Sequence, residues 1–189
     1  MTPNQVLMAT VSRICGPLWD VISPPGAEIT KFPKAFIMAL TANESGAWIK
    51  NNANVPRRFE QSVYERLLKA QKGDEPFGSI KKAIFSGMSD EQLKDYASSW
   101  GLTQIMGYNI LEWEGWTLAD IQNAERHYNG TLRLLWQFEH RFMLNPMKDF
   151  AEFFRCWNTG NPHGKTFDPN YVDNGLARMD TYSSLGESQ

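Results

Sequence analysis

Apolar residues recur every three or four positions through most of this chain, which is the spacing of one face of an α-helix. The first such face follows Thr2-Pro3-Asn4-Gln5, a capping box with proline at the first helical position. It comprises Met8, Val11, Ile14 and Leu18. Ser23-Pro24-Pro25-Gly26 is expected to end this helix. The chain is therefore predicted to be mostly α, an α+β fold with at most a small hairpin.

A second helix is predicted from Pro33 to about Glu44, with Gly46 placed to stop it. Its inner face would carry Phe36, Ile37 and Leu40. The stretch 51–65 allows either a loop with short strands or a helix through Val63 and Leu67.

Further helix starts follow along the chain. They are Ser89-Asp90-Glu91-Gln92, Ser98-Ser99, Thr117 with Asp120, Asn145-Pro146 and Asp168-Pro169. The helix after Ser98-Ser99 would carry Leu102, Ile105 and Met106, and the long helix after Thr117 would break near Gly130. Because the sequence shows no repeat, low-complexity tract or linker, we expect residues 1–189 to form one domain, with an N-terminal helix of about residues 3–19 packed on it.

Charge excludes some classes of partner. The formal net charge is -2, which argues against a nucleic-acid-binding protein and gives no basic patch for a membrane surface. No apolar run approaches the ~20 residues that span a bilayer, so we expect no membrane insertion. The start of the chain shows no signal-peptide pattern, so synthesis in the cytoplasm is expected. Aromatic residues make up 13% of the chain, and they suit both a core and a groove for sugar rings.

Glu44 is the first candidate for chemistry. It continues the apolar stripe of Phe36 and Leu40 at four-residue spacing, so its carboxyl group should be partly desolvated and its pKa raised. A position at the negative end of its own helix would raise the pKa further. A carboxylic acid that keeps its proton near neutral pH is what glycosidic-bond cleavage requires. An ordinary exposed glutamate at a helix end is the alternative.

Three segments carry the remaining motifs: Thr41 to Trp48 with E-S-G, Ser99 to Asn109 with the letters SWGLTQIMGYN, and Cys156 to Pro162 followed by Tyr171-Val172. In this chain order they resemble the lysozyme-like superfamily. Gly101 to Ile105 resembles lytic transglycosylases. The E-S-G motif, the Phe59-Glu60 pair, the second segment and a late aromatic-N-x-G element resemble the phage N-acetylmuramidase endolysins still more closely. The resemblance runs from about Phe36 to Met179.

The resemblance implies a lysozyme-like fold with Glu44 as catalytic acid in a cleft. Gln104 would bind sugar substituents, Gly101 would let the backbone approach the glycan, and Asn158 would hold the substrate or the Glu44 region. Tyr171 would line the far side. The remaining candidates for substrate binding are Ser45, Ile105, Tyr108 and Asn109, of which Ile105 suits the core equally well.

The chain departs from the transglycosylase pattern at two points, of which the second favours the endolysin branch. Trp157 stands where transglycosylases usually have tyrosine, and the separation between Glu44 and Gly101 is longer than in their compact domains. Hydrolysis needs a second carboxylate, for which Glu60 is the best candidate and Glu65 a weaker one. Pairing of Glu60 with Arg57 or Arg58 is its structural alternative. A lytic transglycosylase would need Glu44 alone and would leave anhydro-muramic ends.

Other chemistries fit less well. Cys156 and His163 are too close in sequence for the usual cysteine peptidase, and the three histidines are scattered, so no metal site or cofactor is expected. Cys15 and Cys156 resemble buried thiols more than a disulfide. A non-catalytic glycan-binding or phage-structural module remains the third class. We expect a monomer that acts on peptidoglycan glycan strands in the cell wall after release from the cytoplasm.

Overall fold

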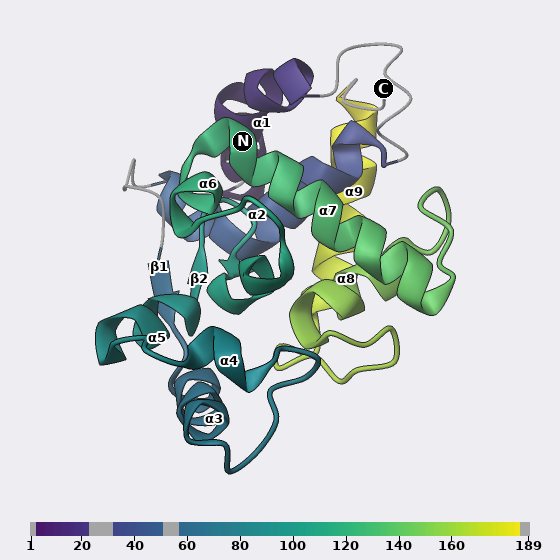
Figure 1. Ribbon diagram of the computed structural model, residues 1–189. Coiled ribbons are helices and arrows are strands. Elements are labelled where there is room, and N and C mark those ends of the chain that lie inside the picture. Colours follow the sequence, from purple (N-terminus) through teal and green to yellow (C-terminus); the bar gives the residue numbers. More distant parts are fainter. Residues whose placement is uncertain (1–2, 23–31, 51–56, 186–189) are drawn as a thin grey trace.

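The computed structural model describes residues 3–22, 32–50 and 57–185 (Figure 1). In chain order the elements are α1 (Pro3–Ile22), α2 (Lys34–Lys50), β1 (Arg57–Phe59), α3 (Gln61–Lys72), α4 (Lys82–Phe85), α5 (Asp90–Tyr96), β2 (Ser98–Trp100), β3 (Ile105–Met106), η1 (Gly107–Glu112), α6 (Leu118–Gln122), α7 (Ala124–Phe142), α8 (Phe150–Thr159) and α9 (Tyr171–Ser184). The prediction of a mostly α chain is confirmed. Its β part is a three-stranded antiparallel sheet in the order β1-β2-β3, one strand more than a hairpin.

Helix α2 lies at the centre of the larger hydrophobic cluster. Residues 35–42 are buried all round, and the helix packs mainly against α9 and α1. Phe36 contacts three phenylalanine rings of α8, with centroids 4.9–6.2 Å away, so the predicted inner face is confirmed. A helix that is apolar on every side must be surrounded by other elements, and α2 is.

A second, smaller cluster is built by α3, α4, α5 and the loop between α3 and α4. Its buried members are Leu67, Ala70, Phe77, Ile80, Phe85, Leu93 and Ala97. Figure 1 shows these helices at one end of the molecule, with β1 and β2 between them and the larger helical body. Tyr96 packs against both clusters. The sheet therefore lies at the junction of two packing units.

Two glycines that were expected to end helices lie inside them instead. Helix α2 continues past Gly46 to Lys50, and α7 continues past Gly130 to Phe142. A Cβ atom on Gly46 would lie 3.0 Å from a methyl carbon of Leu7, and one on Gly130 would lie 3.2 Å from Ile105. Both glycines therefore allow a close approach of neighbouring elements, and close packing outweighs their low helix propensity.

The helix expected after Ser98-Ser99 is wrong. These residues form β2, where Ser98 and Ser99 pair with Phe59 and Arg58, and Ile105 and Met106 form β3. Of the ambiguous stretch 51–65, residues 51–56 lie outside the described residues, and residues 57–65 hold both alternatives, since β1 is followed by α3, which carries Val63 and Leu67.

The helix starts near the other capping signals agree more closely. Ser89 and Gln92 form the predicted capping box, and Thr117 with Asp120 forms a second one. Helices α8 and α9 begin at Phe150 and Tyr171, a few residues after their proline signals. Thr2 and the segment 23–26 lie outside the described residues.

Both cysteines are buried and free, as expected, and burial raises the pKa of Cys15 to about 11 and that of Cys156 to about 12. Within residues 3–22, 32–50 and 57–185, no helix combines the length and apolar character that crossing a bilayer demands.

Candidate active site

Glu44 lies on α2 with its side chain partly buried, where the phenol hydroxyl of Tyr171 donates a hydrogen bond to Oε1. Burial raises the pKa of Glu44 to about 7, while the hydrogen bond from Tyr171 and the charge of Arg58 act in the opposite direction. The raised pKa predicted from the apolar stripe is thus confirmed. The predicted contribution of the helix end is not, because α2 runs six residues beyond Glu44.

Arg58 connects Glu44 with Glu60. Its guanidinium Nε lies 2.9 Å from Glu60 Oε1, and its charge is near enough to Glu44 to lower the pKa of that carboxyl. Glu60 follows β1 directly and is the N-cap residue of α3, with its backbone N–H donating to Ala97 O at 3.0 Å. Of its predicted alternatives, the pairing with Arg58 is therefore present. Phe59, the other half of the pair, is exposed and contacts Tyr64.

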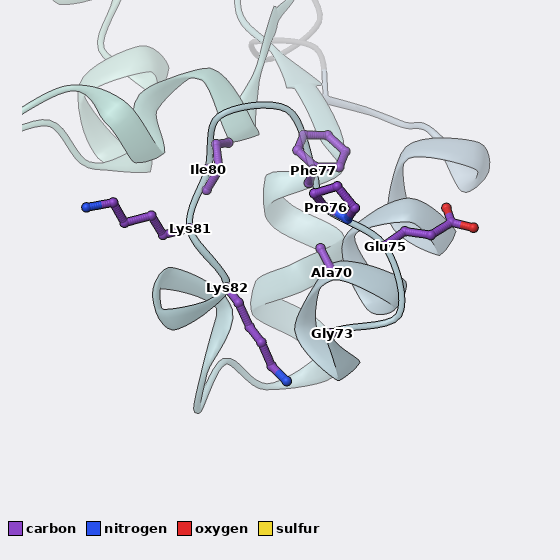
Figure 2. Close-up of a pocket in the computed structure, with 8 residues that line it drawn as sticks. All are labelled: Ala70, Gly73, Glu75, Pro76, Phe77, Ile80, Lys81 and Lys82. Atoms are coloured by element: carbon purple, nitrogen blue, oxygen red, sulfur yellow. The ribbon is translucent and has the colours of Figure 1, made fainter.

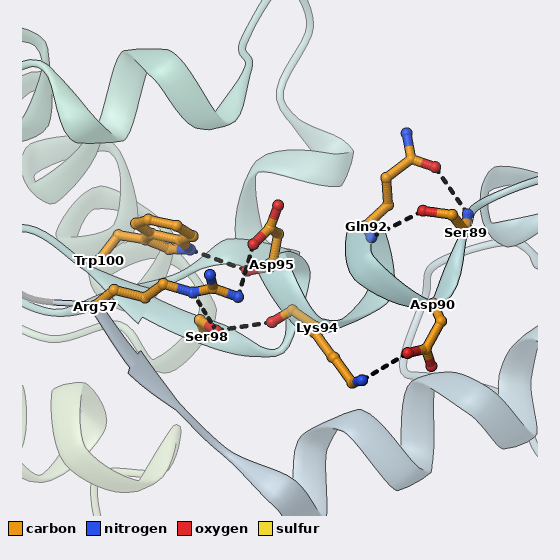
Figure 3. Close-up of polar contacts among 8 residues, drawn as sticks. All are labelled: Arg57, Ser89, Asp90, Gln92, Lys94, Asp95, Ser98 and Trp100. Atoms are coloured by element: carbon orange, nitrogen blue, oxygen red, sulfur yellow. Dashed lines mark hydrogen bonds and ion pairs between the residues drawn. The ribbon is translucent and has the colours of Figure 1, made fainter.

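A polar network fixes the strand that carries Arg58 (Figure 3). Arg57 Nη2 lies 2.7 Å from Asp95 Oδ1, and Arg57 Nε donates to Ser98 Oγ at 3.2 Å. The Arg57 guanidinium also lies over the Trp100 ring, whose Nε1 donates to Asp95 O at 2.9 Å. Successive side chains of a strand point to opposite faces. Arg57 therefore anchors β1 to α5 and β2 on one face while Arg58 takes the other.

Gln104 lies in the turn between β2 and β3, and its backbone is in the left-handed region with φ 58°. Ser99 Oγ donates to Gln104 Oε1 at 2.8 Å, and Gln104 Nε2 donates to Gly101 O at 2.8 Å. Ser99 is also the strand partner of Arg58. The turn that carries Gln104 is thus joined through β2 to the strand beside Glu44.

His127 hydrogen-bonds to the turn between β2 and β3 at Thr103, a role that no sequence motif indicated. It is fully buried on α7, where Nδ1 lies 2.8 Å from Ile121 O and Nε2 accepts from Thr103 N at 3.0 Å. Burial lowers the pKa of His127 to about 4, so the ring is neutral and can accept that bond. A Cβ atom on Gly101, whose φ is 77°, would lie 2.3 Å from the His127 ring. Gly101 therefore lets the backbone approach His127.

The segment from Cys156 to Pro162 also contacts the turn between β2 and β3. Trp157 on α8 donates from Nε1 to Thr103 O at 2.8 Å, so the indole binds the turn. The hydroxyl that bonds to Glu44 belongs to Tyr171. Asn158 is exposed near the end of α8, and Gly160 ends that helix with a left-handed φ of 75°.

The structure also describes the surroundings of the other four predicted ligand-binding residues, Ser45, Ile105, Tyr108 and Asn109. Ser45 is fully buried and donates from Oγ to Thr41 O at 3.1 Å within its own helix, and Ile105 is fully buried in the larger cluster. The Tyr108 ring packs edge-on against Phe77 of the smaller cluster, and its pKa is raised by burial. Asn109 is half-buried in η1. As placed here, Ser45 and Ile105 contribute to packing.

A pocket of about 350 Å³ opens in the smaller packing unit, between the end of α3 and the following loop (Figure 2). Its lining includes Gly73, Phe77, Lys81 and Lys82, and Lys82 Nζ donates to Lys72 O at 3.0 Å. None of the predicted site residues lines it. We therefore place the candidate site at Glu44, where a carboxyl with a raised pKa meets a hydrogen-bond donor and a cation.

Within the described part of the chain, no three His, Cys, Asp or Glu side chains gather as metal ligands would. The chain matches no protein-family model, no curated protein and no solved structure.

Proposed function

We propose that this protein cleaves the β-1,4 bond between N-acetylmuramic acid and N-acetylglucosamine in peptidoglycan, with Glu44 as the general acid. The observation that carries the proposal is the environment of Glu44. Partial burial raises its pKa to about 7, so about half of the molecules keep the proton at neutral pH. The Tyr171 hydroxyl orients the same carboxyl group. A protonated, oriented carboxylic acid is what the departing glycosidic oxygen needs.

The proposed reaction is a hydrolysis. Glu44 gives its proton to the leaving oxygen as the anomeric C–O bond breaks, and water supplies the hydroxyl group that joins the anomeric carbon. Glu60 is the proposed second carboxylate, which would receive the proton of that water or stabilise the cationic centre. Its support is its position, since its ion-pair partner Arg58 is also the cation that acts on Glu44. The reaction needs no cofactor.

A lysozyme-like fold is part of the same proposal. Its support is the order of the three motifs and their convergence. Tyr171 reaches Glu44, the sheet joins Arg58 to Gln104 through Ser99, and Trp157 holds the same turn. Tyr171 of α9 and Arg58 of β1, which lie far from Glu44 in the sequence or on another element, thus both act on its carboxyl group. A protein of this kind would act on cell-wall glycan after release from the cytoplasm.

One observation favours the lytic transglycosylase as a second candidate. Among the Asp and Glu side chains that the structure describes, Glu44 is the only one whose pKa is resolved as raised. In that reaction the muramic sugar's own primary hydroxyl would attack the anomeric carbon, and Glu44 would take back a proton. No second carboxylate would be needed.

Fragment analysis separates these candidates. Purified sacculi are digested while turbidity is followed, and the soluble fragments are analysed by mass spectrometry. Clearing with reducing ends supports hydrolysis, and anhydro-muramic ends would establish the transglycosylase instead. Retained binding to sacculi without any clearing would favour the non-catalytic module.

Three variants test the roles of the carboxylates. Glu44→Gln is expected to lower the clearing rate by about 10²–10⁴-fold, the usual contribution of general acid catalysis. Glu60→Gln should cause a large loss in a hydrolase and little change in a transglycosylase. Glu65→Gln tests the weaker candidate and should change the clearing rate little, because Glu65 is exposed on α3 and bonds to Gln61 on the same helix. Full activity of a folded Glu44→Gln variant would refute the proposal.

A further inference from the structure

Helix α9 is hydrogen-bonded to α2 at Asn43, one residue before Glu44. Asn43 Nδ2 donates to the backbone carbonyl of Tyr171 at 3.0 Å, and the Arg178 guanidinium donates from Nη1 to Asn43 Oδ1. Tyr171 and Arg178 are seven residues apart, so they lie on the same face of α9 two turns apart. Both ends of the Asn43 amide are therefore bonded to that one face.

Tyr171 is held at two points by adjacent residues of α2. Asn43 binds its backbone carbonyl, and Glu44 accepts its hydroxyl hydrogen bond. Its side chain is buried, with the ring edge-on to Phe154 at a centroid distance of 6.3 Å. The position of the hydroxyl on Glu44 thus depends on where Asn43 holds the start of α9.

Arg178 sets which way the Asn43 amide faces. An amide has one accepting end and one donating end, and a guanidinium can only donate. Arg178 therefore requires the oxygen of Asn43 on its side, which leaves the NH₂ group for Tyr171. Arg178 is half-buried, and desolvation lowers its pKa, so the cation is kept there against a cost in free energy.

We propose that Asn43 and Arg178 are positioning residues that hold the Tyr171 hydroxyl on the Glu44 carboxyl group. The proposal rests on the function assigned to Glu44 above. The ionisable and charged groups that act on Glu44 are Tyr171 from α9 and Arg58 from β1, and Arg178 acts on Tyr171. A role in helix packing alone would leave the titration of Glu44 unchanged.

A double-mutant cycle on the Glu44 pKa provides the test. The carboxyl ¹³C shift of Glu44 is titrated by NMR in the wild type, Arg178→Met, Tyr171→Phe and the double variant. Loss of the Tyr171 hydroxyl should raise the pKa, since its hydrogen bond favours the charged form. Arg178→Met should raise it by a smaller amount, and the double variant should match Tyr171→Phe alone. Additive shifts, or no shift in Arg178→Met, would overturn the proposal.

Three further variants complete the design. Arg178→Lys keeps a cationic donor and should restore part of the shift. Arg141→Met removes an exposed guanidinium from α7 and should leave Glu44 unchanged. Should Arg178→Met fail to fold, Asn43→Ala replaces it in the same cycle with the same expected pattern. Because the titration needs no substrate, it judges these residues even where clearing of sacculi fails, so the two proposals can fail separately.

Discussion

Arg58 is the cation on β1 that lowers the pKa of Glu44, and Arg58→Met should therefore raise that pKa. A general acid works in its protonated form, so under the proposed function clearing of sacculi should fall as the pH rises through about 7 in the wild type. In the variant this fall in the clearing rate at alkaline pH should move to higher pH, more at low salt than at high salt, because the Arg58 side chain is 71% exposed and screened. The pH–rate profile measures it.

The control is the neighbouring residue. Arg57→Met removes a guanidinium from the opposite face of the same strand, where it bonds to Asp95 and Ser98. It should loosen the sheet without moving the fall in the clearing rate to a different pH. Equal shifts in both variants would mean that this fall reports damage to β1 and not the charge beside Glu44.

Glu44 also makes the stability of the protein depend on pH. Its pKa is raised from 4.5 to about 7 in the folded chain, so between these values the unfolded chain loses a proton that the folded chain keeps. The free energy of unfolding therefore falls as the pH rises through this window and stays lowered above it. Glu44→Gln removes the effect.

Compared with the wild type, Glu44→Gln should gain about 2–3 kcal/mol between pH 4 and pH 8, for a shift of this size in a partly buried group. Urea denaturation at both pH values measures this gain. Glu114→Gln is the control, since Glu114 is exposed in the segment between η1 and α6. A gain that is the same at both pH values would show that Glu44 titrates normally in the folded protein.

At the scale of elements, the turn between β2 and β3 depends on a glycine against a histidine. Gly101→Ala should lower the free energy of unfolding by more than the ~1–2 kcal/mol that a left-handed backbone costs a residue with a Cβ atom. The added carbon would lie 2.3 Å from the His127 ring, which is itself held by Ile121 and Thr103. Chemical denaturation measures the loss.

Gly115→Ala isolates the contribution of the clash. Gly115 has a φ of 73°, close to the 77° of Gly101, but a Cβ atom there would meet nothing within 4 Å. Both variants incur the backbone strain, and only Gly101→Ala adds the contact with His127. Equal losses in the two variants would mean that the turn yields easily to the extra carbon.

The same elements show what local sequence can and cannot predict. Helices α1, α2, α5, α8 and α9 follow from three- and four-residue spacing and capping residues, which are local signals. Strand β2 does not, because Ser99 is a strand residue only through its pairing with Arg58, 41 positions earlier. In the sequence Gly46 and Gly130 resemble helix stops. In the structure they lie inside helices, where the side chains of Leu7 and Ile105 pack closely against them.

The candidate site also has features that local sequence predicts and features that depend on tertiary contacts. The raised pKa of Glu44 is predictable from sequence, because a carboxylate on an apolar stripe is a local pattern with a direct electrostatic consequence. The groups that lower the pKa of Glu44 come from β1 and α9. No spacing in the sequence predicts that Arg58 or the hydroxyl of Tyr171 lies close to Glu44. The sequence does not distinguish His127 from the other two histidines, since its burial against Thr103 is a tertiary property.

At the scale of the whole molecule, two hydrophobic clusters meet at the sheet and share Tyr96. Ala97 is the last buried residue of the smaller cluster, and β2 follows it directly, while Ile105 after β2 belongs to the larger cluster. Since β2 hydrogen-bonds to strands on both sides, one cluster should not open without disturbing the other. We therefore expect the described parts of the chain to unfold in one cooperative transition.

Tryptophan fluorescence can test this, because the described tryptophans are spread unevenly. Trp113 is buried in the larger cluster and Trp100, Trp116 and Trp157 pack against it, whereas no described tryptophan belongs to the smaller one. Leu93→Ala truncates a buried side chain of the smaller cluster and should cost about 2–5 kcal/mol.

The fluorescence midpoint in thermal unfolding should then fall by roughly 5–15 °C, together with the circular dichroism midpoint. Leu135→Ala, which truncates a buried leucine of the larger cluster, is the matched variant and should shift both signals alike. A Leu93→Ala protein whose dichroism melts early while its fluorescence midpoint stays in place would show that the smaller unit unfolds alone. The site at Glu44 would then depend on a junction that opens independently of the helix that carries the acid.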